Sequence, residues 1–181
     1  MSLKSVLTVI FCLFLVGCST QPKTESVDFP KWALPFEKVE VVQLLKGDYA
    51  QKQFVFQVGL SMKEDGLSLI ALDSMGRRAF SVFWDDNGVT AQKANWMPDM
   101  VRAEYILKDI MMAYWPIDAL GVFDESVRQV GNERIVENNG DKTLSIYSPS
   151  QMDRWNGKVV IENHVLGYRI EIQSKRMKGA S

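Results

Sequence analysis

The stretch Phe54-Val55-Phe56-Gln57-Val58-Gly59-Leu60-Ser61-Met62 places an apolar side chain at every even-numbered position. A period of two is typical of a β-strand with one buried face. Turn-forming residues interrupt the pattern directly afterwards, at Lys63-Glu64-Asp65-Gly66. We therefore predict a half-buried strand that ends in a tight turn.

Similar runs continue along the chain on both sides of a central segment. Leu67–Asp73, Ala79–Trp84 and Val89–Lys93 are separated by turn residues, including Asp85-Asp86-Asn87-Gly88. The later runs are Arg128–Glu137, Thr143–Ser148, Val159–Asn163 and Tyr168–Gln173. Alternating runs that are joined by short turns indicate antiparallel meanders.

The central segment has a helical period instead. Pro98 and Asp99 suit a first helical turn, and Pro116 cannot continue a helix. We predict an amphipathic helix over residues 98–115. The order sheet, helix, sheet argues against a parallel α/β fold. About eight strands and one long helix predict a mainly β (α+β) fold, in which the helix packs on the concave face of a curved antiparallel sheet or incomplete barrel.

The N-terminus carries a separate signal. Lys4 is the only charge in residues 1–17, and the apolar run after it is too short to span a bilayer but has the length of a signal-peptide core. The junction Leu15-Val16-Gly17-Cys18 looks like a bacterial lipobox, which implies cleavage before Cys18 and attachment of lipid to its thiol. By the same resemblance, Ser19 after the cysteine favours the periplasmic face of the outer membrane.

This organisation predicts a signal peptide at 1–17, a lipidated tether at 18–30 and one globular domain at 31–181. Once the signal peptide is removed, Cys18 is the only cysteine, so the mature chain cannot form an internal disulfide. The 21 basic and 22 acidic residues leave a net charge of −1, which argues against a nucleic-acid partner.

Enzyme signatures are mostly missing from the sequence. His164 is the only histidine, so a two-histidine metal site is excluded, and Asp85-Asp86-Asn87 lacks the ligand spacing of a calcium loop. We predict no catalytic residue, no metal site and no cofactor. The alternative is a hydrolase that uses His164 beside a serine or carboxylate in a cleft.

Three segments resemble known families: Leu67-Ser68-Leu69, Asp73–Val82 and Ala113-Tyr114-Trp115-Pro116. In these segments the sequence is similar to a family of bacterial lipoproteins from aryl-polyene-type biosynthesis clusters. In outline, over residues 38–173, it resembles the LolA/LolB group of lipoprotein carriers and receptors. That resemblance implies an incomplete barrel with a helical lid over an apolar cavity.

The candidate ligand site consists of apolar side chains that share two predicted strand faces and the helix. They are Phe54, Phe56, Val58, Leu60, Phe80, Val82, Trp84, Ile106, Ile110, Met111 and Tyr114. If these faces surround a cavity, the protein binds or transfers a lipid-like ligand such as an acyl or polyene lipid or a lipoprotein's acyl chains. If they only pack on one another, a structural lipoprotein that partners an envelope complex becomes the better interpretation.

Overall fold

The computed structural model describes residues 23–27, 29, 31–34, 37–99, 101–121, 123–149 and 153–177. Cys18 and the predicted signal peptide lie outside these residues. The strands are β1 (Lys23–Val27), β2 (Val39–Tyr49), β3 (Lys52–Lys63), β4 (Gly66–Leu72), β5 (Arg78–Asp85), β6 (Gly88–Lys93), β7 (Ser126–Val130), β8 (Glu133–Asn138), β9 (Asp141–Tyr147), β10 (Lys158–Asn163) and β11 (Tyr168–Arg176). The helices are α2 (Ala103–Tyr114), with the short 3₁₀ helices η2 (Ile117–Leu120) and η3 (Arg154–Asn156).

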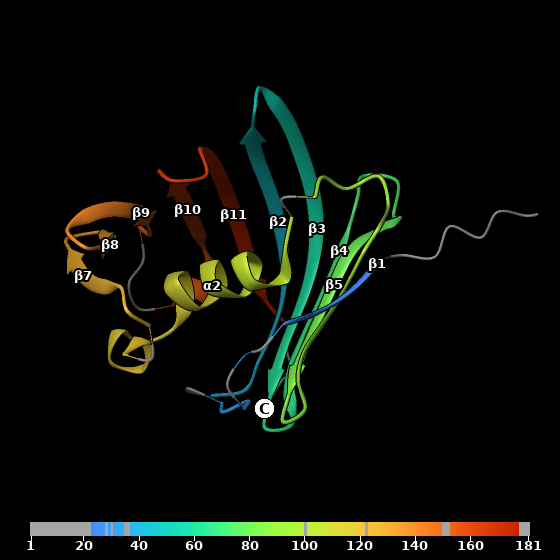
Figure 1. The fold of residues 1–181 in the computed structure, drawn as a ribbon, viewed down its shortest axis with the longest axis horizontal. Helices are drawn as coiled ribbons and strands as arrows, with labels where there is room; N and C mark the ends of the chain where they lie inside the picture. Colours follow the sequence, from blue (N-terminus) through green and yellow to red (C-terminus); the bar gives the residue numbers. More distant parts are fainter. Residues whose placement is uncertain are drawn as a thin grey trace, which may run out of the picture.

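All these strands form one antiparallel sheet in the order β1-β6-β5-β4-β3-β2-β11-β10-β9-β8-β7. Two meanders, β2 to β6 and β7 to β11, are joined where β2 pairs with β11. The chain that leaves β6 must therefore travel across the sheet to reach β7 at the opposite edge. It does so over the concave face, and α2 lies in this crossing (Figure 1). The predicted curved antiparallel sheet with one helix on its concave face is confirmed.

The turns follow the chemistry of the sequence. Asn87 donates its backbone N–H to Asp85 Oδ1 at 2.7 Å, so the Asp85–Gly88 turn is a hairpin as predicted. The turn between β2 and β3 was not evident from composition, because Ala50 and Gln51 occupy it at φ 47° and 65°. Positive φ at two central residues matches the right-handed twist of the flanking strands.

Several predicted boundaries were wrong. The run Arg128–Glu137 is a hairpin of β7 and β8, with Gly131 in the turn at φ 57°. The described residues form eleven strands of one sheet, where about eight were predicted. Pro98 and Asp99 are not helical. Lys93 Nζ donates to Pro98 O at 2.9 Å and pairs with Asp99 at 3.3 Å, so these residues are tied to β6 and α2 begins only at Ala103. Its end before Pro116 agrees with the prediction.

One strand lies within residues 18–30, the range that the sequence analysis assigned to a tether. Lys23–Val27, placed in the tether from composition, form β1 and pair along the outer side of β6. Phe29 packs its ring against Trp84 at 5.3 Å between centroids. A polar edge strand needs only backbone partners, so its side chains carry no alternating apolar signal. The folded domain thus begins before residue 31.

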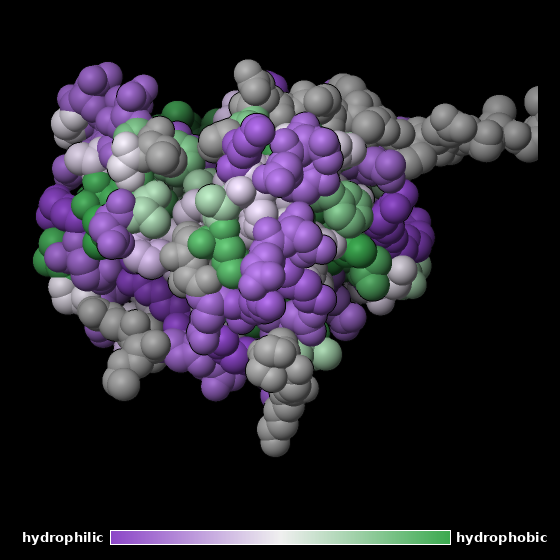
Figure 2. Space-filling view, turned by 90° about the horizontal axis from the view of Figure 1, so that it is seen from below, coloured by the Kyte–Doolittle hydropathy of each residue, from purple (hydrophilic) through white to green (hydrophobic). Residues whose placement is uncertain are grey.

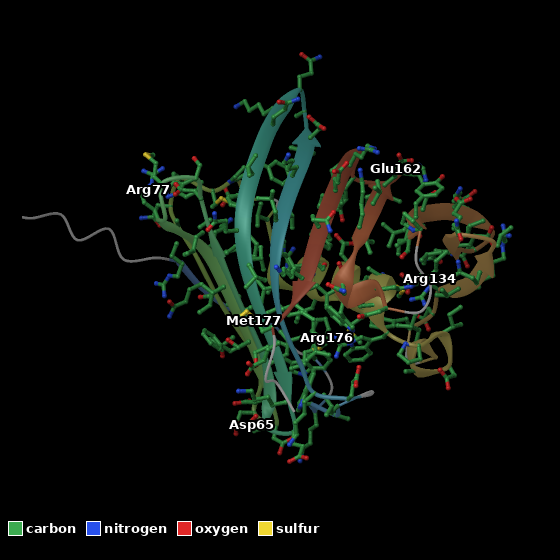
Figure 3. The ribbon with its side chains drawn as sticks, turned by 180° about the vertical axis from the view of Figure 1, so that it is seen from behind. Asp65, Arg77, Arg134, Glu162, Arg176 and Met177 are labelled. Atoms are coloured by element: carbon green, nitrogen blue, oxygen red, sulfur yellow. The ribbon has the colours of Figure 1, made fainter. Side chains whose placement is uncertain are left out.

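Two arginines hold the C-terminal end of α2. Arg134, on β8, donates from Nη1 to Met112 O at 2.7 Å and to Trp115 O at 2.8 Å, and Arg154 donates to Ala113 O at 2.6 Å. These bonds satisfy carbonyl groups that a helix end leaves free. Arg134 lies at the side of the molecule formed by β7 to β9 (Figure 3). At the N-terminal end of α2, the N-cap residue Arg102 makes no side-chain capping hydrogen bond to the described backbone.

The lower end of the molecule, where the β3–β4 hairpin carrying Asp65 lies, is largely hydrophilic. Figure 2 views this end and shows mostly polar residues, interrupted by small groups of apolar residues. Asp65 is labelled there in Figure 3.

Candidate functional site

Cross-strand register divides the concave face into rows of facing side chains. The top row crosses four strands through Asn163, Tyr168, Tyr49 and Lys52. We define the upper half of the face as the rows from Tyr49–Lys52 down to Gln43–Val58. The lower half contains the rows Val41–Leu60 and Val39–Met62. The two halves lie on the same strands, but different segments cover them.

The upper half, together with α2, forms a groove of about 430 Å³. This volume lies within the range of pockets that bind small molecules. Seven of the predicted side chains line it: Phe54, Phe56, Val58, Phe80, Ile106, Ile110 and Tyr114. The structure therefore brings together residues from β3, β5 and α2 around one apolar space.

The other four predicted residues do not line this groove. Leu60, Trp84 and Met111 are at most 3% exposed in the lower half, and Val82 is buried beside a smaller adjoining cavity. Trp84 stacks on Trp115 at 5.8 Å and meets the edge of Trp32 at 5.0 Å. These indoles fill the lower half, so the prediction that all eleven side chains share one pocket was wrong.

The segment at residues 31–34 explains why the lower half is closed. Trp32 donates its Nε1–H to Lys63 O at 2.8 Å, which fixes the indole over the lower rows. No comparable segment of the described chain covers Phe54 or Leu45 in the upper rows. Among the described residues, α2 and the loop before it supply the main cover of the groove.

Adjacent stripes of α2 face the two halves. Ile106, Ile110 and Tyr114 line the groove, whereas Leu107 and Met111 are at most 1% exposed in the core. Spacings of three and four residues align each stripe on the helix surface. The helical period identified the apolar face of α2 but did not separate these stripes.

Further lining residues come from strands, and from the loop before α2, that sequence analysis did not assign to the site. They are Leu45 and Tyr49 of β2, Ile161 of β10, Ile170, Ile172 and Tyr168 of β11, and Trp96 and Met97 of the loop before α2. The period-two pattern of the β11 residues was visible in Tyr168–Gln173. What the sequence did not show is that β11 pairs with β2 and so brings the second meander beside Phe54.

A buried polar cluster closes the lower boundary of the groove. Gln43 Nε2 donates to Tyr114 Oη at 3.1 Å and to Ser174 Oγ at 2.9 Å, and the two hydroxyl groups lie 3.2 Å apart. Burial raises the pKa of Tyr114 to about 12, so its hydroxyl stays protonated. The cluster fixes α2 to β2 and β11 at the point where the two halves meet.

A carboxyl group lies at the top of the groove. Tyr168 Oη donates a short hydrogen bond to Asp109 Oδ2 and accepts one from Asn163 Nδ2 at 3.0 Å. Burial raises the pKa of Asp109 to about 7, although the bond from Tyr168 and the charge of Lys108 oppose this change. Burial also raises the pKa of Tyr168. The α2 helix is therefore bonded to the β10–β11 hairpin across the groove.

A second cavity of about 340 Å³ adjoins the groove. The two share Phe80, Val101, Arg102 and Ile106 in their walls. The second cavity is the more polar of the two, since Lys93, Asp99 and Gln92 also line it. An amphipathic ligand would find its apolar contacts in the groove and polar groups at this side.

His164 has a serine partner, as a hydrolase would require. Ser145 Oγ lies 2.8 Å from His164 Nε2. Ser145 is completely buried, however, and neither residue lines the groove. A nucleophile must reach its substrate, and the complete burial of Ser145 opposes such a role.

In the described ranges no group of three or more His, Cys, Asp or Glu side chains is placed to hold a metal ion. Within the same part of the chain, no helix has both the length and the apolarity needed to cross a bilayer.

Comparison with known proteins gives a family and a distant structural likeness. The model of the family described as "Protein of unknown function (DUF3261)" matches residues 40–176. No curated protein matches the sequence. A crystal structure described as a "putative outer membrane lipoprotein-sorting protein domain from Vibrio parahaemolyticus" is similar over 80% of this chain and 87% of that chain, with 8% identity and a TM-score of 0.44.

Proposed function

The chain belongs to the DUF3261 family, and we propose that it binds a lipid-like hydrophobic ligand in the groove between α2 and the upper half of the sheet. The observation that carries this proposal is the groove of about 430 Å³ with walls that are mainly aliphatic and aromatic. An open apolar groove is unusual where the same sheet packs its lower half tightly. Transfer of acyl or polyene lipids, or of lipoprotein acyl chains, belongs to the same proposal.

Apolar burial supplies the binding energy in this proposal. Each buried CH₂ contributes about 0.8 kcal/mol, so an acyl chain of ordinary length gains enough to offset the entropic cost of binding. The ring centroids of Phe54 and Phe56 lie 5.5 Å apart, and those of Phe56 and Phe80 lie 5.8 Å apart. The three rings therefore form a continuous wall. Such a wall contacts an extended hydrocarbon chain along its length.

Adjacent leucines on β2 offer a matched test. Leu45 lines the groove, whereas Leu44 is 38% exposed on the opposite, convex face. Leu45→Trp should fill the groove and weaken binding of the neutral fluorescent probe N-phenylnaphthylamine about tenfold or more. Leu44→Trp adds the same ring outside the groove and should change binding less than about twofold.

Fluorescence titration of the purified wild-type protein gives the reference value. Absence of saturable probe binding, or equal loss in the two variants, would contradict the proposal. Far-UV circular dichroism of both variants separates a filled groove from a damaged fold.

The site of action in this proposal is the periplasmic face of the outer membrane, where Cys18 carries the lipid anchor. Two or more acyl chains would hold the protein there stably. Cys18→Ser should release the protein from the membrane fraction and remove the mass of the lipid. An unmodified Cys18 in the wild-type protein, seen by intact mass spectrometry, would contradict the anchor.

A second candidate function is a structural lipoprotein that partners an envelope complex. It is favoured by apolar side chains on the convex face: Val42 and Ile70 are 47% and 39% exposed and flank Gly59 in the register. Ile70→Asp should then reduce the size of the assembly in native gel electrophoresis of solubilised membranes. Unchanged assembly size would leave lipid binding as the better proposal.

A further inference from the structure

Asp109 is the only carboxylate among the described residues that line the groove. It lies on the groove-facing side of α2, between the stripe of Ile106 and Ile110 and the β10–β11 hairpin. A half-buried carboxylate beside apolar walls is costly unless polar partners satisfy it. Its hydrogen bonds therefore indicate what the top of the groove is built to contact.

Only one of its two oxygens has a hydrogen-bond partner among the residues that the structure describes. The Tyr168 hydroxyl gives its single proton to Asp109 Oδ2, and Asn163 Nδ2 occupies a lone pair of the same hydroxyl. Tyr168 is thus oriented by Asn163 and cannot donate elsewhere. No hydrogen bond to Asp109 Oδ1 is present within the described ranges, so this oxygen is available to a donor in the groove.

The charged neighbours compensate Asp109 only in part, through the charge of Lys108, which acts to lower the carboxyl pKa. Lys108 bonds to Glu125. Lys52 lies in the same top row but two strands from Tyr168, about 10 Å away in the sheet. Arg102 pairs with Glu104 at 3.0 Å. Within the described part of the chain, no cation forms an ion pair with the carboxylate.

Building on the proposed function, we propose that Asp109 is a specificity-determining residue that accepts a hydrogen bond, at Oδ1, from an ammonium group of the bound lipid. An ammonium group neutralises the carboxylate and satisfies its second oxygen in one contact. A carboxylate or phosphate at this point would place two like charges together in an apolar site. The groove therefore selects long-chain ligands with an amine over those with an acid at the same position.

Three probes that share one alkyl chain test this selectivity. Dodecanol, dodecylamine and dodecanoate are used to displace N-phenylnaphthylamine from the full-length protein at about pH 8, where Asp109 is mainly ionised. Dodecylamine should bind about tenfold or more tightly than dodecanol, as expected of a hydrogen bond between charged groups. Dodecanoate should bind more weakly than dodecanol.

Substitutions connect this order to the carboxylate. Asp109→Asn keeps the shape of the side chain and should reduce the ratio of amine to alcohol affinity to near one. Asp109→Glu keeps the charge and should retain a preference for the amine. Asp118→Asn removes the same charge from exposed η2 outside the groove and should leave the ratio as in the wild type.

The outcomes distinguish this inference from the proposed function. If dodecanol displaces the probe but dodecylamine is no better, the groove binds apolar chains and the role of Asp109 is overturned. The same conclusion follows if Asp109→Asn keeps the amine preference or if Asp118→Asn also loses it. If none of the three ligands displaces a bound probe, the proposed function itself fails.

Discussion

The upper and lower halves of the concave face use the same strands and the same alternation, but they are packed differently. In the lower half Trp84, Trp115 and Trp32 are at most 6% exposed and fill the space between sheet and helix. In the upper half Phe54 and Leu45 are only partly buried and border the groove. The difference shows that a buried face of a strand can be core along one part of its length and binding surface along another.

The largest expected effect is on the free energy of unfolding, when an aromatic side chain is removed from the lower half and, for comparison, from the upper half. Trp84→Ala leaves a cavity among three other rings and should lower the free energy of unfolding by about 3–5 kcal/mol. Phe54→Ala only widens an existing groove, so a loss below about 2 kcal/mol is expected. Urea unfolding followed by circular dichroism measures both. Equal losses would mean that the upper half is packed as tightly as the lower.

Neighbouring residues of α2 sharpen the comparison within one helix. Leu107 is completely buried in the core, whereas Ile106 is half-buried at the groove. Leu107→Ala should cost about 2–4 kcal/mol, and Ile106→Ala about 1 kcal/mol, with little contribution from helix propensity in either case. Only Ile106→Ala should also alter probe binding. A larger loss for Ile106→Ala than for Leu107→Ala in urea unfolding would mean that Ile106 belongs to the core and Leu107 to the groove.

The polar support of α2 gives the next largest effect. Arg134→Met should cost about 2–3 kcal/mol, because the carbonyl groups of Met112 and Trp115 would remain buried without donors. Arg128 makes an exposed ion pair with Glu137, and Arg128→Met should cost less than about 1 kcal/mol. Thermal unfolding at constant pH compares them. A loss in the Arg134 variant no greater than in the Arg128 variant would contradict the helix-end role.

The smallest predicted effect is a pH dependence confined to the upper half. The pKa of Asp109 is about 7 in the folded protein and near 3.8 in the unfolded chain. The unfolded chain therefore loses this proton first as pH rises, so the contribution of Asp109 to stability falls between about pH 4 and pH 7. The change is on the order of 2 kcal/mol after allowance for partial exposure.

Asp109→Asn should remove this fall. The difference in unfolding free energy between variant and wild type, measured by urea titration at several pH values, isolates it from other carboxylates such as Glu133, whose lowered pKa acts in the opposite direction. A difference that stays constant across this range would show that Asp109 titrates normally in the folded state.

Local chemistry was sufficient for much of the fold. The alternation around Phe54–Met62, the turn at Asp85–Gly88 and the stop at Pro116 each depend on residues close in sequence, and each prediction is confirmed. The strand β1 and the turn at Ala50-Gln51 escaped prediction because they are formed by backbone pairing and backbone conformation rather than by a distinctive side-chain pattern.

Local sequence patterns could not predict how the candidate site is divided into an open groove and a filled core. Phe56 and Trp84 both follow the alternation of apolar strand residues, and by sequence alone they are equivalent. Which one is covered depends on Trp32, which is distant in the chain and is fixed by its bond to Lys63 O. The hydrogen bond from Tyr168 to Asp109 likewise joins two residues that are 59 positions apart in the sequence, on β11 and α2. Sequence therefore determined which faces are apolar, whereas tertiary packing decided which part of that surface is filled, because filling depends on the volume that distant segments occupy.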